Sequence, residues 1–202
     1  QLPFARGTYT ISNNSWSFGD NPGYSYKCSA FWVSQTQQIL VVYGYPNTAW
    51  IYNPLTDTYN TTFTTIVPNP TNIFAAGAVM YQDSVWLAGS GRDLTAFRTV
   101  SNDLSTWTDK PSNANGTAYI DMVQFDDVML TFGGLLSDDE ISPSVSRINQ
   151  YNISSQVWST LDVELPMTLG GASAQLIGPS VFIFGGIYYK DAMDGPYFSN
   201  KS

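Results

Sequence analysis

Histidine is absent from the sequence, and cysteine occurs once, at Cys28. Histidine is the commonest general base in enzymes and the commonest ligand of transition metals, and cysteine is the other usual ligand of zinc and copper. We therefore expect no zinc or copper site of ordinary composition and no catalysis that depends on a histidine base. A single cysteine cannot form an internal disulfide, so we expect Cys28 to be buried and unreactive, and the alternative is a disulfide with another chain.

Basic residues, long apolar stretches and catalytic motifs are also scarce. The chain has 8 Lys and Arg against 16 Asp and Glu, and its basic residues are scattered singly. Nucleic-acid-binding surfaces need clustered basic residues, so we expect no nucleic-acid partner. No apolar run approaches the ~18 residues of a spanning helix, so we expect no membrane insertion in this segment. Without a nucleophile, phosphate-loop or dinucleotide motif, we expect no enzyme activity and no cofactor.

Aromatic residues and small polar residues are abundant, and together they favour strands and turns over helices. Within this background, an apolar run that ends at a glycine occurs four times. These glycines follow one another at intervals of 45, 44 and 52 residues, and they are Gly44, Gly89, Gly133 and Gly185.

A second marker recurs with nearly the same period. It is a pair of mostly aromatic residues seven positions apart, and successive copies start 43, 48 and 51 residues apart. The pairs are Tyr9 with Trp16, Tyr52 with Tyr59, Val100 with Trp107, and Tyr151 with Trp158. Two markers that share one period indicate an internal repeat, and a period of ~40–50 residues is typical of β-propeller blades.

Each repeat divides into four short strands. In the repeat at 117–161 we expect them at 117–124, 128–132, 145–151 and 156–161. The continuous apolar second strands predict coverage on both faces, as in blades packed between neighbours. Glycine allows a tight turn and a close backbone approach, and aromatic side chains fill the space between blades, so we expect both markers to be structural.

The pattern resembles the kelch repeat, in which a hydrophobic run ends in two glycines and a Tyr and a Trp follow. The best match is Leu130-Thr131-Phe132-Gly133-Gly134 with Tyr151 and Trp158, and Phe184-Gly185-Gly186 matches the glycine part. The other copies depart from the pattern, with Tyr45 in place of a second glycine, Ser90 between Gly89 and Gly91, Val100 in place of the Tyr, and Tyr59 in place of the Trp.

The resemblance implies an all-β propeller of kelch-like four-stranded blades, about four of them in this chain. We interpret residues 1–202 as a single propeller domain or fragment, divided into outer strands of a blade at 1–18, blades at 25–67, 73–110 and 117–161, and inner strands of a further blade at 170–202. We expect a partial propeller, and the alternative is a closed four-bladed ring in which the first segment completes the last. An open arc would leave strand edges unpaired, which favours self-assembly through those edges.

Metal chemistry has one candidate, the acidic run Asp138, Asp139 and Glu140, because clustered oxygen ligands suit calcium. A solvated acidic loop is the simpler interpretation, so we expect no metal site. Some kelch-type propellers belong to copper-radical oxidases of the galactose oxidase type, which use Tyr and His ligands and a cross-linked Cys. A chain without histidine does not supply that centre.

Five sites fit the Asn-x-Ser/Thr pattern of N-glycosylation, namely Asn13, Asn60, Asn115, Asn152 and Asn200. Three of them, Asn13, Asn152 and Asn200, fall at the equivalent outer turn of a repeat, where a bulky sugar would face solvent. This placement predicts an extracellular protein, either secreted or at the cell surface. Aromatic residues outside the repeat markers are candidates for a sugar-stacking platform, although packing is the simpler interpretation; they are Trp32, Trp50, Tyr188, Tyr189 and Tyr197.

These observations together predict a non-catalytic extracellular propeller glycoprotein. We expect it to act in protein or glycan binding, or as a structural unit of a larger assembly. One alternative is the propeller portion of a secreted enzyme that resembles a carbohydrate oxidase, with its catalytic residues outside this chain. Another is an intracellular kelch adaptor in which the glycosylation sequences are unused.

Overall fold

The computed structural model describes residues 6–10, 15–19, 29–42, 49–60, 76–91, 93–103, 105–137, 142–188 and 197–198. Nine of the positions singled out above lie outside these residues, namely Asn13, Cys28, Gly44, Tyr45, Asp138, Asp139, Glu140, Tyr189 and Asn200.

The described part of the chain consists of antiparallel strands and turns and contains no helix. Three sheets have four strands each. In chain order, their strands are β3 (Ser29–Val33), β4 (Gln38–Val42), β5 (Ala49–Asn53) and β6 (Thr58–Asn60); β7 (Gly77–Tyr81), β8 (Ser84–Ala88), β9 (Phe97–Ser101) and β10 (Trp107–Asp109); and β11 (Asp121–Phe125), β12 (Val128–Phe132), β13 (Arg147–Asn152) and β14 (Val157–Glu164). The two-stranded sheets are β1 (Arg6–Thr10) with β2 (Ser15–Gly19), β15 (Ser173–Ile177) with β16 (Ser180–Phe184), and β17 (Ile187–Tyr188) with β18 (Tyr197–Phe198).

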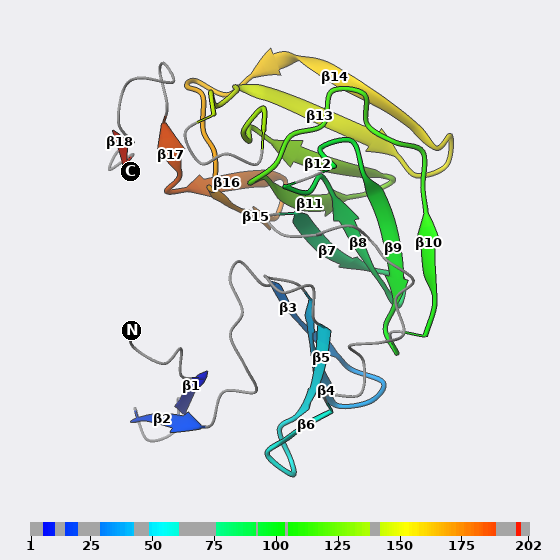
Figure 1. The fold of residues 1–202 in the computed structure, drawn as a ribbon, viewed down its shortest axis with the longest axis vertical. Coiled ribbons are helices and arrows are strands. Elements are labelled where there is room, and N and C mark those ends of the chain that lie inside the picture. Colours follow the sequence, from blue (N-terminus) through cyan, green and yellow to red (C-terminus); the bar gives the residue numbers. More distant parts are fainter. Residues whose placement is uncertain are drawn as a thin grey trace.

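The sheets follow one another around an open arc, with β3–β6, β7–β10, β11–β14 and β15–β16 in succession (Figure 1). Strands within each four-stranded sheet are adjacent in chain order, as in a propeller blade. The first strands lie on the inner side of the arc, where β11 contacts both β7 and β15. Among the described residues, β1–β2 and β15–β16 are separate sheets, so the alternative of a closed four-bladed ring is not formed. The chain is a partial all-β propeller, which confirms the predicted fold class.

One predicted strand starts later than expected. β11 begins at Asp121 and not at position 117, because Tyr119 has a φ of 56°, outside the range of an extended strand. The residue before it, Ala118, forms an isolated β-bridge with Leu135 beyond the end of β12.

The residues of each aromatic pair lie directly opposite one another across a hairpin. In the third repeat, Tyr151 on β13 faces Trp158 on β14, and their ring centroids are 5.2 Å apart. Both rings also contact Phe97 on β9 of the preceding sheet, at 4.6 Å from Tyr151 and 4.9 Å from Trp158. The remaining pairs have the same register, Tyr9 with Trp16, Tyr52 with Tyr59, and Val100 with Trp107.

The hydrophobic core lies between successive sheets. Val33 and Leu40 of the β3–β6 sheet are buried against Val85 and Leu87 of the next sheet. The same arrangement recurs one sheet later, where the buried cluster contains Ala88 and Phe97 from β7–β10 and Met122, Met129 and Tyr151 from β11–β14. In a pleated strand successive side chains point to opposite faces, so each inner sheet packs on both neighbours.

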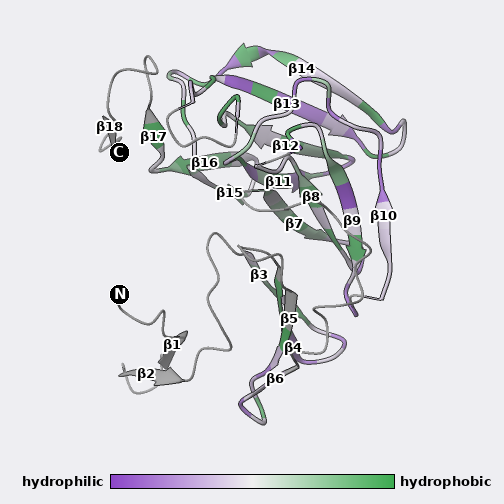
Figure 2. Cartoon of the chain, viewed as in Figure 1, coloured by the Kyte–Doolittle hydropathy of each residue, from purple (hydrophilic) through white to green (hydrophobic). Residues whose placement is uncertain are grey.

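The prediction that every second strand is covered on both faces is wrong for β16. Its hydrophobic character is plain in Figure 2, yet Phe182 and Phe184 are 45% and 60% exposed. Their equivalents in β4 and β12, Leu40 and Phe132, are 0% and 7% exposed. The difference arises because a following sheet covers β4 and β12, whereas none among the described residues covers β16.

The glycines that directly follow β8, β12 and β16 show the same difference between covered and uncovered second strands. Gly89 and Gly133 have φ values of 67° and 62°, and a Cβ there would lie 2.2 Å and 2.3 Å from the carbonyl oxygens of Thr117 and Leu169. Each of these carbonyls precedes the first strand of the following sheet by four residues. Gly185 has the same φ of 67°, but a Cβ there would meet nothing within 4 Å. Glycine is therefore required at two of these positions by both conformation and space, and at the third by conformation alone.

Gly133→Ala and Gly185→Ala form a matched test of this packing. Both substitutions force a side chain into the left-handed region, which costs about 1–2 kcal/mol. Gly133→Ala additionally forces the backbone of the next sheet away, and overpacking of this kind costs about 1–3 kcal/mol more. Denaturant unfolding of both variants should show a clearly larger loss for Gly133→Ala. Equal losses would mean that the sheet containing β12 is not in close contact with the segment at Leu169.

Candidate binding site

The first strands of four successive sheets line an open cavity of about 530 Å³. Short residues of β3 and β7 form one side of it, and β11 and β15 supply most of the polar groups. The lining residues that bear on function are Phe31, Asp121, Gln124, Ser173 and Gln175.

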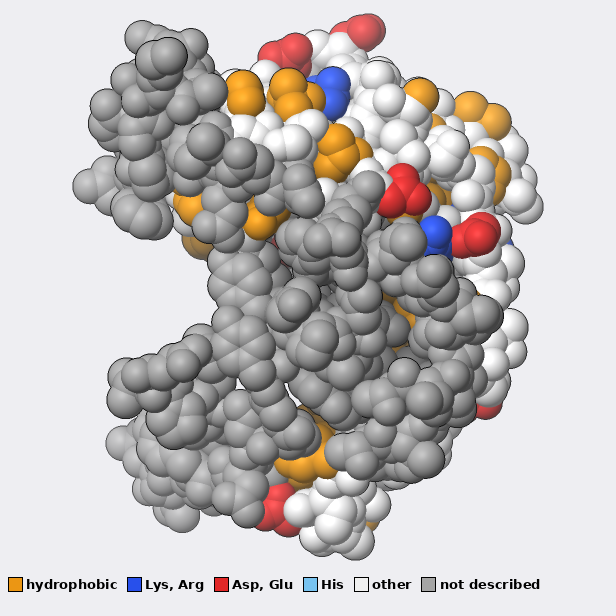
Figure 3. Space-filling model, viewed as in Figure 1, with side chains coloured by type: hydrophobic (Ala, Val, Ile, Leu, Met, Phe, Trp, Pro, Cys, Tyr) orange, Lys and Arg blue, Asp and Glu red, His pale blue; other side chains and the backbone are white. Residues whose placement is uncertain are grey.

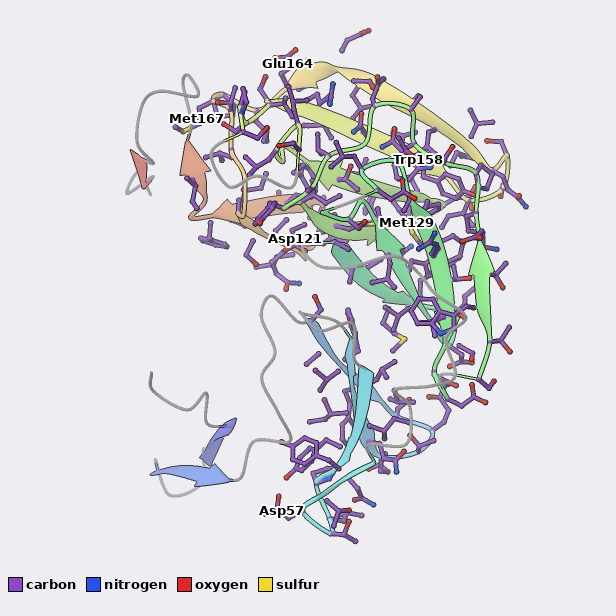
Figure 4. All side chains as sticks on the ribbon, in the orientation of Figure 1. Asp57, Asp121, Met129, Trp158, Glu164 and Met167 are labelled. Atoms are coloured by element: carbon purple, nitrogen blue, oxygen red, sulfur yellow. The ribbon has the colours of Figure 1, made fainter. Side chains whose placement is uncertain are left out.

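Asp121 is a half-buried carboxylate at the start of β11, on the inner side of the arc (Figure 4). Its Oδ2 accepts hydrogen bonds from the Ala174 backbone N–H at 2.7 Å and from the Ser173 hydroxyl at 3.3 Å. Its other oxygen, Oδ1, accepts from the Met122 backbone N–H at 2.9 Å. Burial raises the pKa of Asp121, although these three donors oppose that shift. The carboxylate thus joins β11 to β15 and holds two neighbouring sheets together.

The two glutamines of the cavity already have partners. The Gln124 side-chain amide donates to the carbonyl of Asp126, and the Gln175 amide donates to the carbonyl of Leu176. Their side-chain carbonyls, together with the half-buried ring of Phe31, give the cavity a mixed polar and aromatic lining.

Asn152 opens the turn between β13 and β14. Its Oδ1 accepts a hydrogen bond from the Ser155 backbone N–H at 2.7 Å. A glycan would be attached to the other side-chain atom, Nδ2, which takes no part in this hydrogen bond. Asn53 occupies the same place in the first four-stranded sheet, where its Oδ1 accepts from the Leu55 backbone N–H at 2.9 Å. Because Pro54 follows it, Asn53 does not lie in an N-glycosylation sequence. Turn geometry alone therefore favours asparagine at this position.

Asn115 lies on the surface in the segment before β11. Its Nδ2 donates to the Thr160 hydroxyl at 3.0 Å, so the nitrogen that would carry a glycan already binds the neighbouring strand β14. The third residue of this glycosylation sequence, Thr117, is buried and donates to the Gly133 carbonyl at 2.7 Å. Asn60 ends β6 opposite Ile51, and its side chain lies outside the described part.

The adjacent carboxylates Asp126 and Asp127 belong to the turn between β11 and β12. Asp126 has a φ of 49°, and Asp127 accepts a hydrogen bond from the Ser154 backbone N–H at 3.2 Å. Within the ranges that the structure describes, no three His, Cys, Asp or Glu side chains come together to hold a metal ion. On the face seen in Figure 3, the described charged side chains are scattered and not gathered by sign. No helix long and apolar enough to cross a membrane occurs among the described residues.

Sequence reasoning missed Asp121 as a functional residue. A signal exists in the repeat, because the equivalent first position of the other inner strands is Ser29, Gly77 or Ser173. Asp121 is the acidic residue at a position that is otherwise serine or glycine, and its carboxylate binds the neighbouring strand β15.

Asp121→Asn tests the environment of this carboxylate through the pH dependence of stability. A folded-state pKa above the unfolded value means that the folded state binds the proton more tightly, so the contribution of Asp121 falls as pH rises from about 4 through the folded pKa. Denaturant unfolding between about pH 4 and pH 7 should therefore show a smaller loss for Asp121→Asn than for the natural chain. Identical profiles for Asp121→Asn and the natural chain would contradict the buried, raised-pKa carboxylate.

Comparison with known proteins bears on the fold alone. No protein-family model matches the chain, and no curated protein matches it. Among solved structures, one titled "Structure of YjhT" superposes with a TM-score of 0.52 at 17% sequence identity. The match covers 61% of this chain and 37% of that chain, so this chain corresponds to well under two thirds of the length of YjhT. The similarity supports a propeller-like architecture.

Proposed function

We propose that this chain is a non-catalytic kelch-type propeller of an extracellular glycoprotein, and that it acts by binding protein and building larger assemblies. The observation that carries the proposal is the end face, the side of β15–β16 that presents Ile177, Phe182 and Phe184. These side chains are 56%, 45% and 60% exposed. Contiguous exposed apolar surface of this kind marks interaction sites in soluble proteins.

The end face has the construction of surfaces that are buried elsewhere in the arc. Val33 and Leu40 occupy the positions of Ile177 and Phe182 in the first four-stranded sheet, and they are 4% and 0% exposed beneath the next sheet. Burial of a large apolar side chain contributes about 1.5–3 kcal/mol. Because Ile177, Phe182 and Phe184 are each already about half buried, a partner that covers them would gain part of this free energy for each.

The geometry of the end face favours a protein partner over a glycan. The rings of Phe182 and Phe184 are stacked, with an interplanar angle of 11° and centroids 6.4 Å apart, so they form one apolar patch. Sugar sites need polar groups beside an aromatic ring, and the neighbouring Gln175 amide is turned to the Leu176 carbonyl. Among the described strands, β16 pairs with β15 alone.

Two further observations support a non-catalytic, extracellular role. The Asp121 carboxylate, the acidic group of the cavity, is bound to three donors and serves to connect sheets. Asn152 lies at an exposed hairpin turn where an attached sugar would not disturb the Oδ1 hydrogen bond. The kelch assignment is supported by the repeated glycine-terminated strand, with Tyr151 and Trp158 packed between sheets.

Site-specific photo-crosslinking tests the proposal. A benzoylphenylalanine in place of Phe182, in protein secreted by eukaryotic cells, should crosslink to a polypeptide, whereas the same group at Val163 should not. Val163 is 68% exposed on β14, outside the end face, and is therefore a matched control. Equal or absent crosslinking at both positions would contradict a binding role of the end face. Peptide mass mapping of the same preparation should find sugar on Asn152, and an unmodified Asn152 would contradict the glycoprotein part.

A further inference from the structure

The two hydrophobic contacts between the described four-stranded sheets follow one rule. The side of a sheet that contains Val33 and Leu40 packs on the opposite side of the next sheet, which contains Val85 and Leu87. The contact between β7–β10 and β11–β14 repeats this order. Among the described sheets of this series, β3–β6 and β15–β16 each have one side that no other sheet of the series covers, and these two sides are of the two kinds that pack together elsewhere.

The first uncovered side is the end face. Besides its exposed side chains, it has Gly185, where an added Cβ would meet nothing within 4 Å, unlike at Gly89 and Gly133. At Gly89 and Gly133, the approaching carbonyl belongs to the segment that precedes the next sheet. The end face therefore lacks two features that accompany each completed contact, the buried apolar side chains and the carbonyl at the glycine.

The second uncovered side, the start face, lies on β3 and β4 and contains Trp32, Ile39 and Val41. Trp32 pairs directly with Ile39, so both point to the same side of the sheet. Trp32 is 51% exposed, and Ile39 and Val41 are half-buried. The position equivalent to Trp32 in the next sheet is Met80, which packs against the core cluster shared with β3–β6. Trp32 is thus an aromatic side chain at a position that elsewhere contacts a preceding sheet.

We propose that the occupant of the end face is a second copy of this chain, docked through its start face. The inference rests on the proposed function, because it names the partner of the same surface. In this arrangement Phe182 and Phe184 of one copy cover Trp32 of the next and continue the sheet-on-sheet contact already present twice in each copy. The contact is head-to-tail, and such contacts close into a ring or continue as a filament.

Three variants separate this arrangement from others in sedimentation velocity experiments over a range of concentrations. The natural chain should associate as its concentration rises. Phe182→Ser/Phe184→Ser, which alters the end face, and Trp32→Ser, which alters the start face, should each associate at least about tenfold more weakly. Leu55→Ser is the control, because Leu55 is 84% exposed at the β5–β6 hairpin and belongs to neither face. It should associate as the natural chain does.

Mixing the two weakened variants gives the decisive result. The Phe182→Ser/Phe184→Ser copy retains an intact start face and the Trp32→Ser copy retains an intact end face, so an equimolar mixture should form a one-to-one complex. A Trp32→Ser variant that associates like the natural chain would overturn the head-to-tail contact. It would indicate instead that two copies associate through their end faces. A natural chain that is monomeric at every concentration would overturn the second copy as the partner. In that case, crosslinking of position 182 to a different protein would leave the proposed function standing.

Discussion

Packing of one sheet on the next is the interaction on which the remaining structure depends. Each interior sheet buries aliphatic and aromatic side chains on both sides, as Leu40 against Val85 and Phe97 against Tyr151 show. The sheets approach closely because Gly89 and Gly133 leave no room for a side chain beneath the next backbone. Asp121 adds a polar connection at the inner edge, where its carboxylate binds the backbone of β15. No single sheet of this size buries enough apolar surface alone, so the arrangement is cooperative.

The repeat made most of this architecture predictable from the sequence. Spacing of seven between Tyr151 and Trp158 corresponds to their pairing across a hairpin, and the period of the glycines corresponds to successive sheets. Features that depend on contacts between sheets were not predictable in the same way. The start of β11 is set by the φ of Tyr119, the role of Asp121 by its reach to Ala174, and the exposure of Phe184 by the absence of a covering sheet. An apolar run such as Val181–Phe184 has the same sequence pattern whether or not a neighbouring sheet covers it.

The candidate functions divide according to position in the arc. At its inner side, the Asp121 carboxylate binds Ser173 and Ala174 and so holds β11 and β15 together, which favours a structural role for Asp121. At its ends, apolar side chains that the fold buries elsewhere are exposed. We therefore explain binding by this chain as the same sheet-on-sheet packing that stabilises its fold. A sheet of the partner would pack on the end face as each sheet packs on the next within the chain.

The measurement that tests the central claim most directly is a double-mutant cycle between Phe97 on β9 and Tyr151 on β13. These rings belong to neighbouring sheets, and their centroids are 4.6 Å apart. Unfolding free energies of Phe97→Leu, Tyr151→Leu and the double variant should give a coupling of about 0.5–1.5 kcal/mol, as for other aromatic pairs in contact. Strictly additive effects would show that the two sheets do not pack on one another, and the account of the propeller would then fail.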